Sequence, residues 1–405
     1  MIYFDAAATT FQKPRTVKDT VRAAMDSMSS PGRGNYPTAA LAAKTLFQCR
    51  MELGELFGVE NPEQVVFTSS ATHGLNIAIR SLVRPGGRVV VSGYEHNAVT
   101  RVLHAMEGLT IYVVNTPLFD APAMVRGFEE LVTPDTDAVI CTHVSNVFGY
   151  LLPVEEIAGV CRRSRVPLIL DASQSAGCIP IDQRTLGAAF IAMPGHKGLY
   201  GPQGTGVLLC GEEGEPLLYG GTGSSSQDQQ MPGFLPDRME AGTHNVPGIA
   251  GLLAGLRFVR TTGLAAIRHH GTRLKDQLLT ALEGEERYQV FGSRDAALQT
   301  GVLSLVPRDG DPETLCEYLS AKGIALRGGL HCAPYAHRTA GTLDTGTARF
   351  SVSAFNRPDE VERLIEALKK YKCFGHSKDN IEPLRERNPR GFLSRCPPRT
   401  EKFTN

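Results

Sequence analysis

Residues 168–198 decide the fold: this stretch begins with LILDASQ at 168–174 and ends with AMPGHKG at 192–198. Each of these two segments starts as a short apolar run and ends in polar residues, among them Asp171 and Lys197. Strands that alternate with helical patterns form mostly parallel sheets. The runs at 65–68, 88–92, 110–114, 138–142, 167–171, 190–193 and 206–210 therefore predict an α/β fold. Its mostly parallel seven-stranded sheet should carry helices on both faces.

The rest of the chain predicts further helices and a second unit. Helical patterns lie at 14–28, 39–57, 72–82, 154–164, 248–261 and 264–282. The pattern changes at 219–236, where Gly, Ser, Gln and Pro predict a long loop over a functional site. Beyond it, strands at 302–306, 324–326 and 348–351 and a helix at 361–371 predict a smaller α+β unit.

The length of 405 residues exceeds one ordinary domain. We expect a large domain at 14–250 and a small C-terminal α+β domain made of 1–13 and 251–372. Residues 373–405 contain several prolines, many Arg, Lys and Asn residues, and few large apolar side chains. This composition predicts an extended or partly disordered tail.

Composition excludes several classes of protein. With 42 basic and 42 acidic residues the net charge is zero, which gives no electrostatic case for nucleic acid binding. We find no signal peptide and no apolar stretch long enough to span a membrane. The nine cysteines are scattered and form no C-x-x-C pair, which argues against a disulfide framework and a zinc ribbon. We expect a cytoplasmic protein without metal ligands.

Polar side chains follow five of the predicted strands. The carboxyl ends of parallel strands meet at one edge of a sheet, so these side chains should lie together. The segment 69–76, SSATHGLN, opens a helix whose free amides favour a phosphate. The remaining candidates are His96 in YEHN, Asn146 in HVSN, Asp171 and Gln174 in DASQ, and His196 and Lys197 in GHK.

A carboxylate at one strand end and a lysine just past the next are the arrangement that holds pyridoxal phosphate. The Lys197 amine would form a Schiff base with the aldehyde, and Asp171 would keep the pyridine nitrogen protonated. Either residue alone would fit a helix cap or a solvated surface position. Together with a phosphate seat and a stacking ring, they predict a pyridoxal phosphate enzyme.

At these residues the sequence closely resembles the class V aminotransferase family of fold type I pyridoxal phosphate enzymes, in its cysteine desulfurase branch. The resemblance runs from YFDAAATT at 3–10 to about Leu368. It implies that Lys197 binds the cofactor covalently, that His96 stacks on the ring and carries a proton, and that Asp171 is the pyridinium partner. It also implies that Gln174 bonds the phenolic oxygen, and that Ala71, Thr72 and His196 bind the phosphate.

Two further segments extend the resemblance. EAGTHN at 240–245 matches the stretch whose threonine, here Thr243, reaches the phosphate of a neighbouring subunit, which implies a homodimer. RGGLHCA at 327–333 resembles the short catalytic-cysteine loop of group II desulfurases and selenocysteine lyases, with Cys332 as nucleophile. Arg349 matches the arginine that clamps the substrate carboxylate, assisted by Arg327 and Asn146.

One position departs from the family pattern. Two residues before His196, where the family usually has a hydroxyl side chain that donates to the phosphate, this chain has Pro194. Proline has neither a hydroxyl group nor an N–H. The phosphate should therefore depend more on Thr72, on His196 and on the helix amides.

The resemblance predicts that L-cysteine is converted to L-alanine with a persulfide on Cys332. A sulfur-acceptor protein would receive the sulfur from this persulfide. Selenocysteine lyase activity on L-selenocysteine, or another lyase or transaminase reaction of this fold, remains open. A non-catalytic scaffold is the alternative of another class, against which the intact Lys197, Asp171 and Cys332 argue. A nucleotide-hydrolysing enzyme would need a G-x-x-x-x-G-K-[ST] motif, which the sequence lacks.

Overall fold

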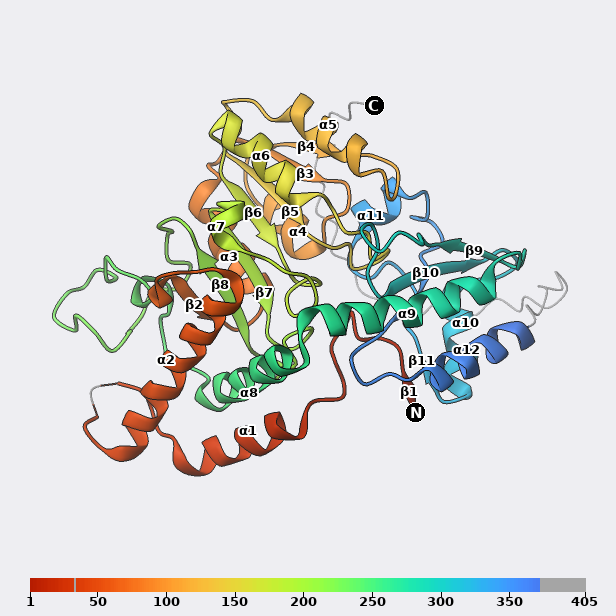
Figure 1. Ribbon diagram of the computed structural model, residues 1–405. Helices are drawn as coiled ribbons and strands as arrows, with labels where there is room; N and C mark the ends of the chain where they lie inside the picture. The colour runs from red at the N-terminus through yellow and green to blue at the C-terminus, as the bar shows by residue number, and fades with distance from the viewer. Residues whose placement is uncertain (33, 372–405) are drawn as a thin grey trace, which may run out of the picture.

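A seven-stranded sheet forms the centre of the computed structural model, which describes residues 1–32 and 34–371 (Figure 1). Its strand order is β2-β8-β7-β6-β5-β3-β4. β8 runs antiparallel to both of its neighbours, and every other pairing is parallel. The bounds are β2 Val65–Thr68, β3 Arg88–Ser92, β4 Thr110–Val114, β5 Ala138–Thr142, β6 Leu168–Asp171, β7 Phe190–Pro194 and β8 Gly206–Cys210. The predicted α/β sheet is confirmed.

Both faces of this sheet are apolar because its strands are buried on both sides. Leu168 and Leu170 of β6 pack on one face, and Ile169 between them packs on the other. The first face is covered by α2 Pro37–Phe57, α5 Ala121–Leu131, α6 Val154–Ser164 and α8 Val246–Thr262. The second face is covered by α3 Ala71–Leu82 and α4 Asn97–His104. Near-continuous Val, Ile and Leu runs are typical of such two-sided burial.

The second unit has its own core around a three-stranded antiparallel sheet, in the order β12-β10-β9. Its strands are β9 Tyr288–Phe291, β10 Val302–Pro307 and β12 Ala348–Ser351, and its helices include α10 Pro312–Ala321 and α12 Pro358–Lys370. The intervening α11 Pro334–Thr339 packs against the core of the large sheet. The N-terminal strand β1 Ile2–Tyr3 pairs with β11 Ile324–Ala325, so the first residues of the chain join the second unit. The domain boundaries given above remain a proposal.

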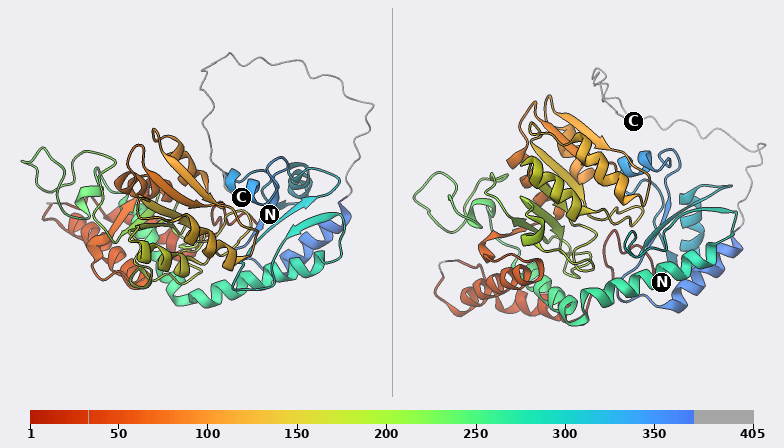
Figure 2. Two further views of the ribbon diagram at one scale, coloured as in Figure 1. Left: turned by 90° about the horizontal axis from the view of Figure 1, so that it is seen from above. Right: turned by 45° about the horizontal axis from the view of Figure 1, so that its top comes forward.

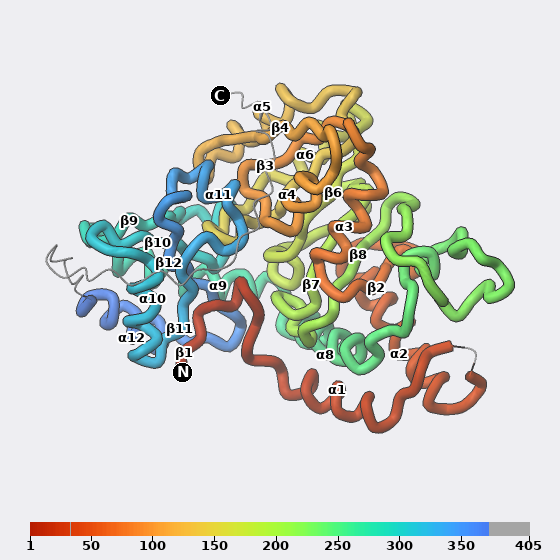
Figure 3. Tube along the Cα trace, turned by 180° about the vertical axis from the view of Figure 1, so that it is seen from behind, coloured from red at the N-terminus to blue at the C-terminus, as the bar shows by residue number. Residues whose placement is uncertain are grey.

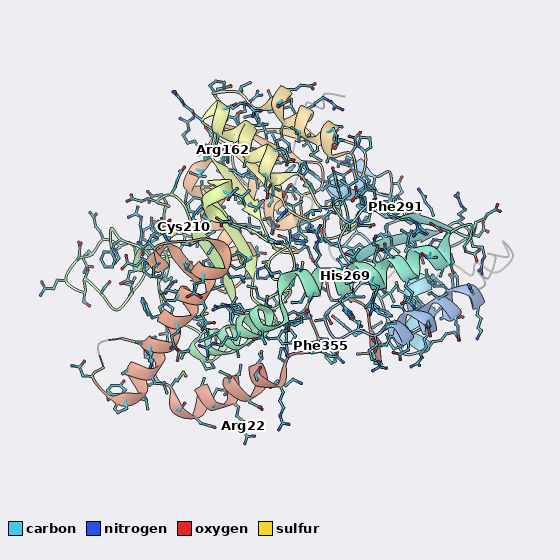
Figure 4. All side chains as sticks on the ribbon, viewed as in Figure 1. Arg22, Arg162, Cys210, His269, Phe291 and Phe355 are labelled. Carbon is cyan, nitrogen blue, oxygen red and sulfur yellow. The ribbon has the colours of Figure 1, made fainter. Side chains whose placement is uncertain are left out.

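Helices α8 and α9 Leu264–Leu282 run along one side of both units (Figures 1 and 2). They bend by 79° at their junction, where Phe258 stacks on Phe355 with ring centroids 5.6 Å apart. Figure 4 places Phe355 beside this bend and His269 on α9. Among the described residues no single helix is long and apolar enough to cross a membrane, and only the bent pair together meets the length and composition required.

The N-terminal segment connects the two units at the centre of the molecule. It climbs from β1 to the middle of the structure and then turns away to α1 Arg15–Ser27 (Figure 3). Along this path the Ala7 amide bonds the Ser351 hydroxyl at 3.0 Å in the small unit. The Thr10 amide bonds the His196 carbonyl at 3.2 Å in the large unit. Residues 5–13 therefore lie against both units.

The structure differs from the sequence-based prediction mainly in elements that were missed. β1, β9, α4, α5, α10 and α11 were not predicted, and neither was α7 Gln183–Leu186. Most of these are short, and the two-residue β1 has no periodicity to detect. Residues 219–236 contain no helix or strand, as predicted, but they extend outward from the sheet end that holds β2 rather than over a site of their own chain (Figure 1). The predicted tail at 373–405 lies outside the described residues.

Candidate active site

The ends of β5, β6 and β7 meet at one edge of the large sheet. Thr142 is in register with Asp171, and Asp171 with Ala192 of β7. The His143 amide donates to the Asp171 carbonyl at 2.9 Å, which continues the pairing by one residue. The Asp171 side chain is buried, at 2% exposure, and its Oδ1 accepts the Ser173 amide at 2.9 Å. A buried carboxylate therefore stands at the sheet edge where ligands of this fold bind.

Lys197 follows β7 on a tightly packed glycine turn. A Cβ on Gly198 would come within 2.2 Å of the Ala176 carbonyl oxygen, so only glycine allows this close approach. The turn is fixed from the N-terminal segment, since the His196 carbonyl accepts Lys13 Nζ at 2.8 Å and the Thr10 hydroxyl at 3.0 Å. The lysine backbone is thus held firmly while its amine remains available.

The electrostatic surroundings make the Lys197 amine easy to deprotonate. Burial lowers its pKa to about 8, and the positive charge of Arg349 acts in the same direction, while the negative charge of Asp171 opposes the shift. A lysine that is partly neutral near physiological pH is a nucleophile that can form a Schiff base. Perturbed lysines of this kind are typical of functional sites.

His96 lies in the same field. Burial lowers its pKa to about 4, with Asp171 opposing this and Lys197 reinforcing it, so the ring is neutral at physiological pH. Its Nδ1 accepts the Ala98 amide at 3.0 Å, which places the ring proton on Nε2. The structure therefore brings Asp171, Lys197 and His96 into one electrostatic cluster, as their strand-end positions predicted.

Glu95 is a residue at this site that the sequence analysis missed. Its side chain is fully buried and accepts the Thr142 amide at 2.7 Å and the Ser92 hydroxyl at 2.5 Å. It thereby joins the ends of β3 and β5 directly beside His96. Burial raises its pKa to about 8. Its position between two polar neighbours in YEHN gave no sequence signal, because burial of a glutamate is a property of the tertiary fold.

The first turn of α3 offers free backbone amides. The Ser70 side chain caps the helix by accepting the His73 amide at 3.2 Å. The amides of Ala71 and Thr72 have no hydrogen-bond partner among the described residues. Ala71 is buried and the Thr72 side chain is exposed. Free amides at a helix N-terminus form an anion-binding site.

The other two predicted phosphate contacts lie on different elements. His196 Nδ1 lies 3.0 Å from the Thr9 hydroxyl, and burial lowers the pKa of this histidine to about 4. Thr243 is exposed, on the segment between the large sheet and α8.

Pro194 is the last residue of β7, in register with Gly206. The side chain of Gln174 donates to the Ala7 carbonyl at 2.9 Å, which ties it to the N-terminal segment.

The Thr243 segment is anchored by a buried ion pair that the sequence did not reveal. Arg50 of α2 binds Glu240 through both terminal nitrogens, at 2.8 and 2.6 Å. His244 also bonds this carboxylate, at 2.5 Å. Although burial alone raises the pKa of Glu240, the bonds from His244 and Arg50 outweigh it and hold the pKa below its ordinary value. Glu240 is therefore ionised and connects α2 with the Thr243 segment.

Cys332 is the one exposed thiol among the described cysteines, and its loop is held by backbone contacts. The φ of Cys332 is 56° and that of His331 is 49°. Both lie in the left-handed region, which residues other than glycine rarely adopt. The Asn97 amide donates to the Cys332 carbonyl at 2.7 Å, and the Asn146 amide group donates to the His331 carbonyl at 2.8 Å. Such a strained turn persists only where its surroundings fix it, as at many functional sites.

Arg349 lies in β12 with its side chain only 2% exposed. Its Nη1 donates to the Asn146 carbonyl at 3.0 Å, and its Nη2 lies 2.5 Å from Oδ1 of Asp5. Arg327 is exposed and adjoins it through the backbone, since the Arg349 amide donates to the Arg327 carbonyl at 2.8 Å. The predicted substrate-binding residues Arg349, Arg327 and Asn146 therefore lie together.

Comparisons with known proteins agree with this arrangement, which is that of a fold type I α/β enzyme. The sequence matches the family Aminotransferase class-V over residues 2–364. This chain belongs to the class V aminotransferase family. A probable cysteine desulfurase of Methanothermobacter thermautotrophicus is 31% identical over 92% of this chain and 95% of its own length. A probable cysteine desulfurase of Vibrio cholerae is 30% identical over 91% and 93%.

Two solved structures are similar over almost the whole chain. The apo structure of a cysteine desulfurase from Thermococcus onnurineus has a TM-score of 0.84 at 28% identity, covering 91% of this chain and 94% of its own. The cysteine desulfurase CsdA from Escherichia coli has a TM-score of 0.80 at 26% identity, covering 91% and 93%. These likenesses confirm the predicted fold.

Proposed function

We propose that this protein is a pyridoxal phosphate-dependent cysteine desulfurase, which converts L-cysteine to L-alanine and retains the sulfur as a persulfide on Cys332. The position of Cys332 carries this proposal. Its thiol is exposed on a strained turn whose carbonyls bond to Asn97 and Asn146, beside the predicted cofactor and substrate residues. A transaminase or a simple lyase would have no use for such a thiol.

The residues at the sheet edge fit pyridoxal phosphate. Asp171 offers a buried carboxylate for the ring nitrogen, and Lys197 offers an amine whose pKa burial lowers to about 8. The free amides of Ala71 and Thr72 suit the phosphate, together with the His196 side chain and, from a second subunit, Thr243. Gln174 would bond the phenolic oxygen, and the neutral His96 ring would stack on the pyridine. When bound, the cofactor supplies an electron sink for bonds broken at the substrate α-carbon.

The chain's own groups perform the remaining steps. Arg349, with Arg327 and Asn146 beside it, holds the substrate carboxylate, and the Lys197 amine moves the α-proton. The Cys332 thiolate attacks the substrate sulfur, so that a sulfur–sulfur bond forms as the carbon–sulfur bond breaks. One cysteine and one thiol thereby yield one alanine and one persulfide, with His96 available at Nε2 to carry a proton.

Mapping the persulfide tests this proposal. The protein would be loaded with pyridoxal phosphate, mixed with L-cysteine, alkylated and digested, and the peptides weighed. We expect one additional sulfur atom on the peptide that contains Cys332. Cys178 serves as the internal control, because it is half-buried and burial raises its pKa to about 12. Sulfur distributed over several cysteines, or none on Cys332, would contradict the proposal.

We also propose that the protein works as a homodimer. Large apolar side chains are exposed on α2, where Leu41, Phe47 and Met51 have exposed fractions of 40%, 56% and 40%. Leu218, Tyr219 and Phe234 are exposed on the outward loop, at the same end of the molecule as α2 (Figure 1). Several large apolar side chains exposed in one region of a protein favour an interface. The adjacent Thr243 would then serve the phosphate of the second subunit.

The proposal includes a cytoplasmic location and transfer of the sulfur from Cys332 to an acceptor protein. The seven described cysteines are all free thiols, which fits the reducing cytoplasm. A persulfide on the exposed Cys332 would be accessible to the thiol of a sulfur-acceptor protein. L-Selenocysteine remains the alternative substrate, because it carries the same α-amino and α-carboxylate groups as L-cysteine and has selenium in place of sulfur.

A further inference from the structure

The guanidinium of Arg349 already contacts a carboxylate from its own chain. Asp5 Oδ1 lies 2.5 Å from Arg349 Nη2, with exposed fractions of 18% for the aspartate side chain and 2% for the arginine. Nη1 of Arg349 donates to the Asn146 carbonyl at 3.0 Å. Its Nε is buried and has no hydrogen-bond partner among the described residues. The arginine therefore keeps its Nε–H and one further N–H on each terminal nitrogen for a ligand.

Asp5 is fixed in this position by its backbone. Its carbonyl accepts the Tyr3 hydroxyl at 3.1 Å and the Ala8 amide at 3.1 Å. It also forms a parallel bridge with Ser351, the residue at the end of β12. The residues on both sides of it are bonded as well, since the Phe4 amide donates to the Ala325 carbonyl and the Thr10 amide to the His196 carbonyl. The backbone of Asp5 is therefore held beside Arg349, and its carboxylate has Arg349 as its partner.

Arg327 adds a second cation, which forms no ion pair in the described part of the chain, although the Glu313 carboxylate lies beside the nearby Gly329. Arg327 is exposed, and its backbone pairs with that of Arg349. Its positive charge contributes to lowering the pKa of Arg349, after burial, which is the main cause. Two guanidinium groups and the Asp5 carboxylate sum to about one positive unit, and the nearby Lys197 and Asp171 carry opposite charges when both are ionised. The group can neutralise a single further carboxylate.

We propose that Asp5 is a specificity-determining residue, which restricts this two-arginine site to ligands with one acidic group. This inference rests on the proposed function, in which Arg349 binds the substrate carboxylate. The α-carboxylate of cysteine balances the remaining charge. A second acidic group on the ligand would lie near the fixed Asp5 carboxylate without a cation of its own, and like charges at short range repel.

Two ligands of equal length test the proposal on the cofactor-loaded protein. Butyrate carries one carboxylate and succinate carries two, and neither has an amine that could react with the cofactor. Their dissociation constants would be measured by titration calorimetry for the parent protein and for Asp5→Asn. The parent should prefer butyrate. In Asp5→Asn the affinity for succinate relative to butyrate should rise about tenfold or more, the size of effect expected when a close like charge is removed.

Three further variants make the result decisive. Asp19→Asn removes an equal charge from the exposed face of α1, where Asp19 lies 3.5 Å from Arg15, and should leave the ratio unchanged. Asp5→Asn combined with Arg327→Gln restores the net charge and should return the ratio to that of the parent, which a merely structural role of Asp5 would not allow. Should Asp5→Asn fail to fold, Asp5→Ser replaces it.

The outcomes separate this inference from the proposed function. If Arg349→Ala binds butyrate as the parent does, the substrate-carboxylate site is wrong and both proposals fail. If Arg349→Ala loses both ligands while Asp5→Asn leaves the ratio unchanged, the proposed function stands and the inference about Asp5 is overturned.

Discussion

The backbone amide of Asn97 donates to the carbonyl of Cys332 at 2.7 Å. This bond joins the residue after His96 to the residue that carries the exposed thiol. The contact uses main-chain atoms only. The backbone at Cys332 is therefore held beside the backbone at His96 whichever side chain stands at position 332. Replacing Cys332 by alanine removes the sulfur while this bond remains, so the variant reports on chemistry rather than on loop position.

Covalent attachment of the cofactor should occur at Lys197 alone. We expect borohydride treatment of the loaded protein, followed by peptide mapping, to place the label on the peptide that contains Lys197. Lys197→Ala should lose the label and the yellow colour. Lys13 is the matched control, since its amine bonds the His196 carbonyl next to Lys197 and burial lowers its pKa to about 8 as well. Label on Lys13 instead would show that the site assignment is wrong.

The rate of cofactor attachment should depend on pH through the Lys197 amine. Burial lowers its pKa to about 8, and only the neutral amine reacts. Below that pH the rate should rise about tenfold per pH unit, and above it the rate should level off. Asp171→Asn removes a charge that raises this pKa, so its plateau should begin at lower pH. Stopped-flow absorbance after adding pyridoxal phosphate to the apoprotein measures both, and a rate still rising near pH 10 would contradict the account.

Glu240→Gln should destabilise the protein strongly. The side chains of Glu240 and Arg50 are 3% and 9% exposed, and breaking a buried pair typically costs about 3–5 kcal/mol. Glu129→Gln is the control: its partner Arg163 lies 2.8 Å away, but both side chains are largely exposed, and such pairs contribute about 1 kcal/mol or less. Urea unfolding compares the two free energies of unfolding. Equal effects would mean that the Glu240 pair does not anchor the Thr243 segment.

The dimer can be tested at the exposed surface of α2. Sedimentation of the parent should give about twice the 43.8 kDa mass of one chain. Phe47→Glu places a charge on the apolar surface and should shift the protein toward monomer, with weaker cofactor binding because Thr243 would then lack a second subunit to serve. Arg22→Glu on the outward side of α1 is the control (Figure 4). A parent that sediments as a monomer and binds the cofactor fully would contradict the dimer.

The fold followed largely from local sequence, because buried parallel strands are continuous apolar runs. All seven strands of the large sheet were predicted within one residue of their ends. The positions of Asp171, Lys197 and His96 just after predicted strands also predicted that these residues lie together. The two-residue β1, which was missed, depends on pairing with the distant β11, and β9 Tyr288–Phe291, also missed, is a short strand that pairs with the following β10.

Long-range polar contacts could not be predicted in the same way. The Asp5–Arg349 pair and the Arg50–Glu240 pair each join residues from distant parts of the chain. None of these four residues has neighbours in the sequence that would indicate its partner. Burial of charge is decided by which elements pack together, and that is a property of the whole fold.

Alanine formation by Cys332→Ala tests the central claim most directly. The parent, Cys332→Ala and Cys178→Ala would be loaded with pyridoxal phosphate and supplied with L-cysteine and a reducing thiol, and alanine would be quantified over time. Sulfur leaves carbon poorly unless a thiolate accepts it, so Cys332→Ala should lose at least about 99% of the rate, of the order seen when a catalytic nucleophile is removed. Cys178→Ala should keep the parent rate, and turnover of L-selenocysteine by Cys332→Ala should partly survive. Alanine formed from L-cysteine by Cys332→Ala at the parent rate would show that Cys332 is structural and that the protein is not a desulfurase of this kind.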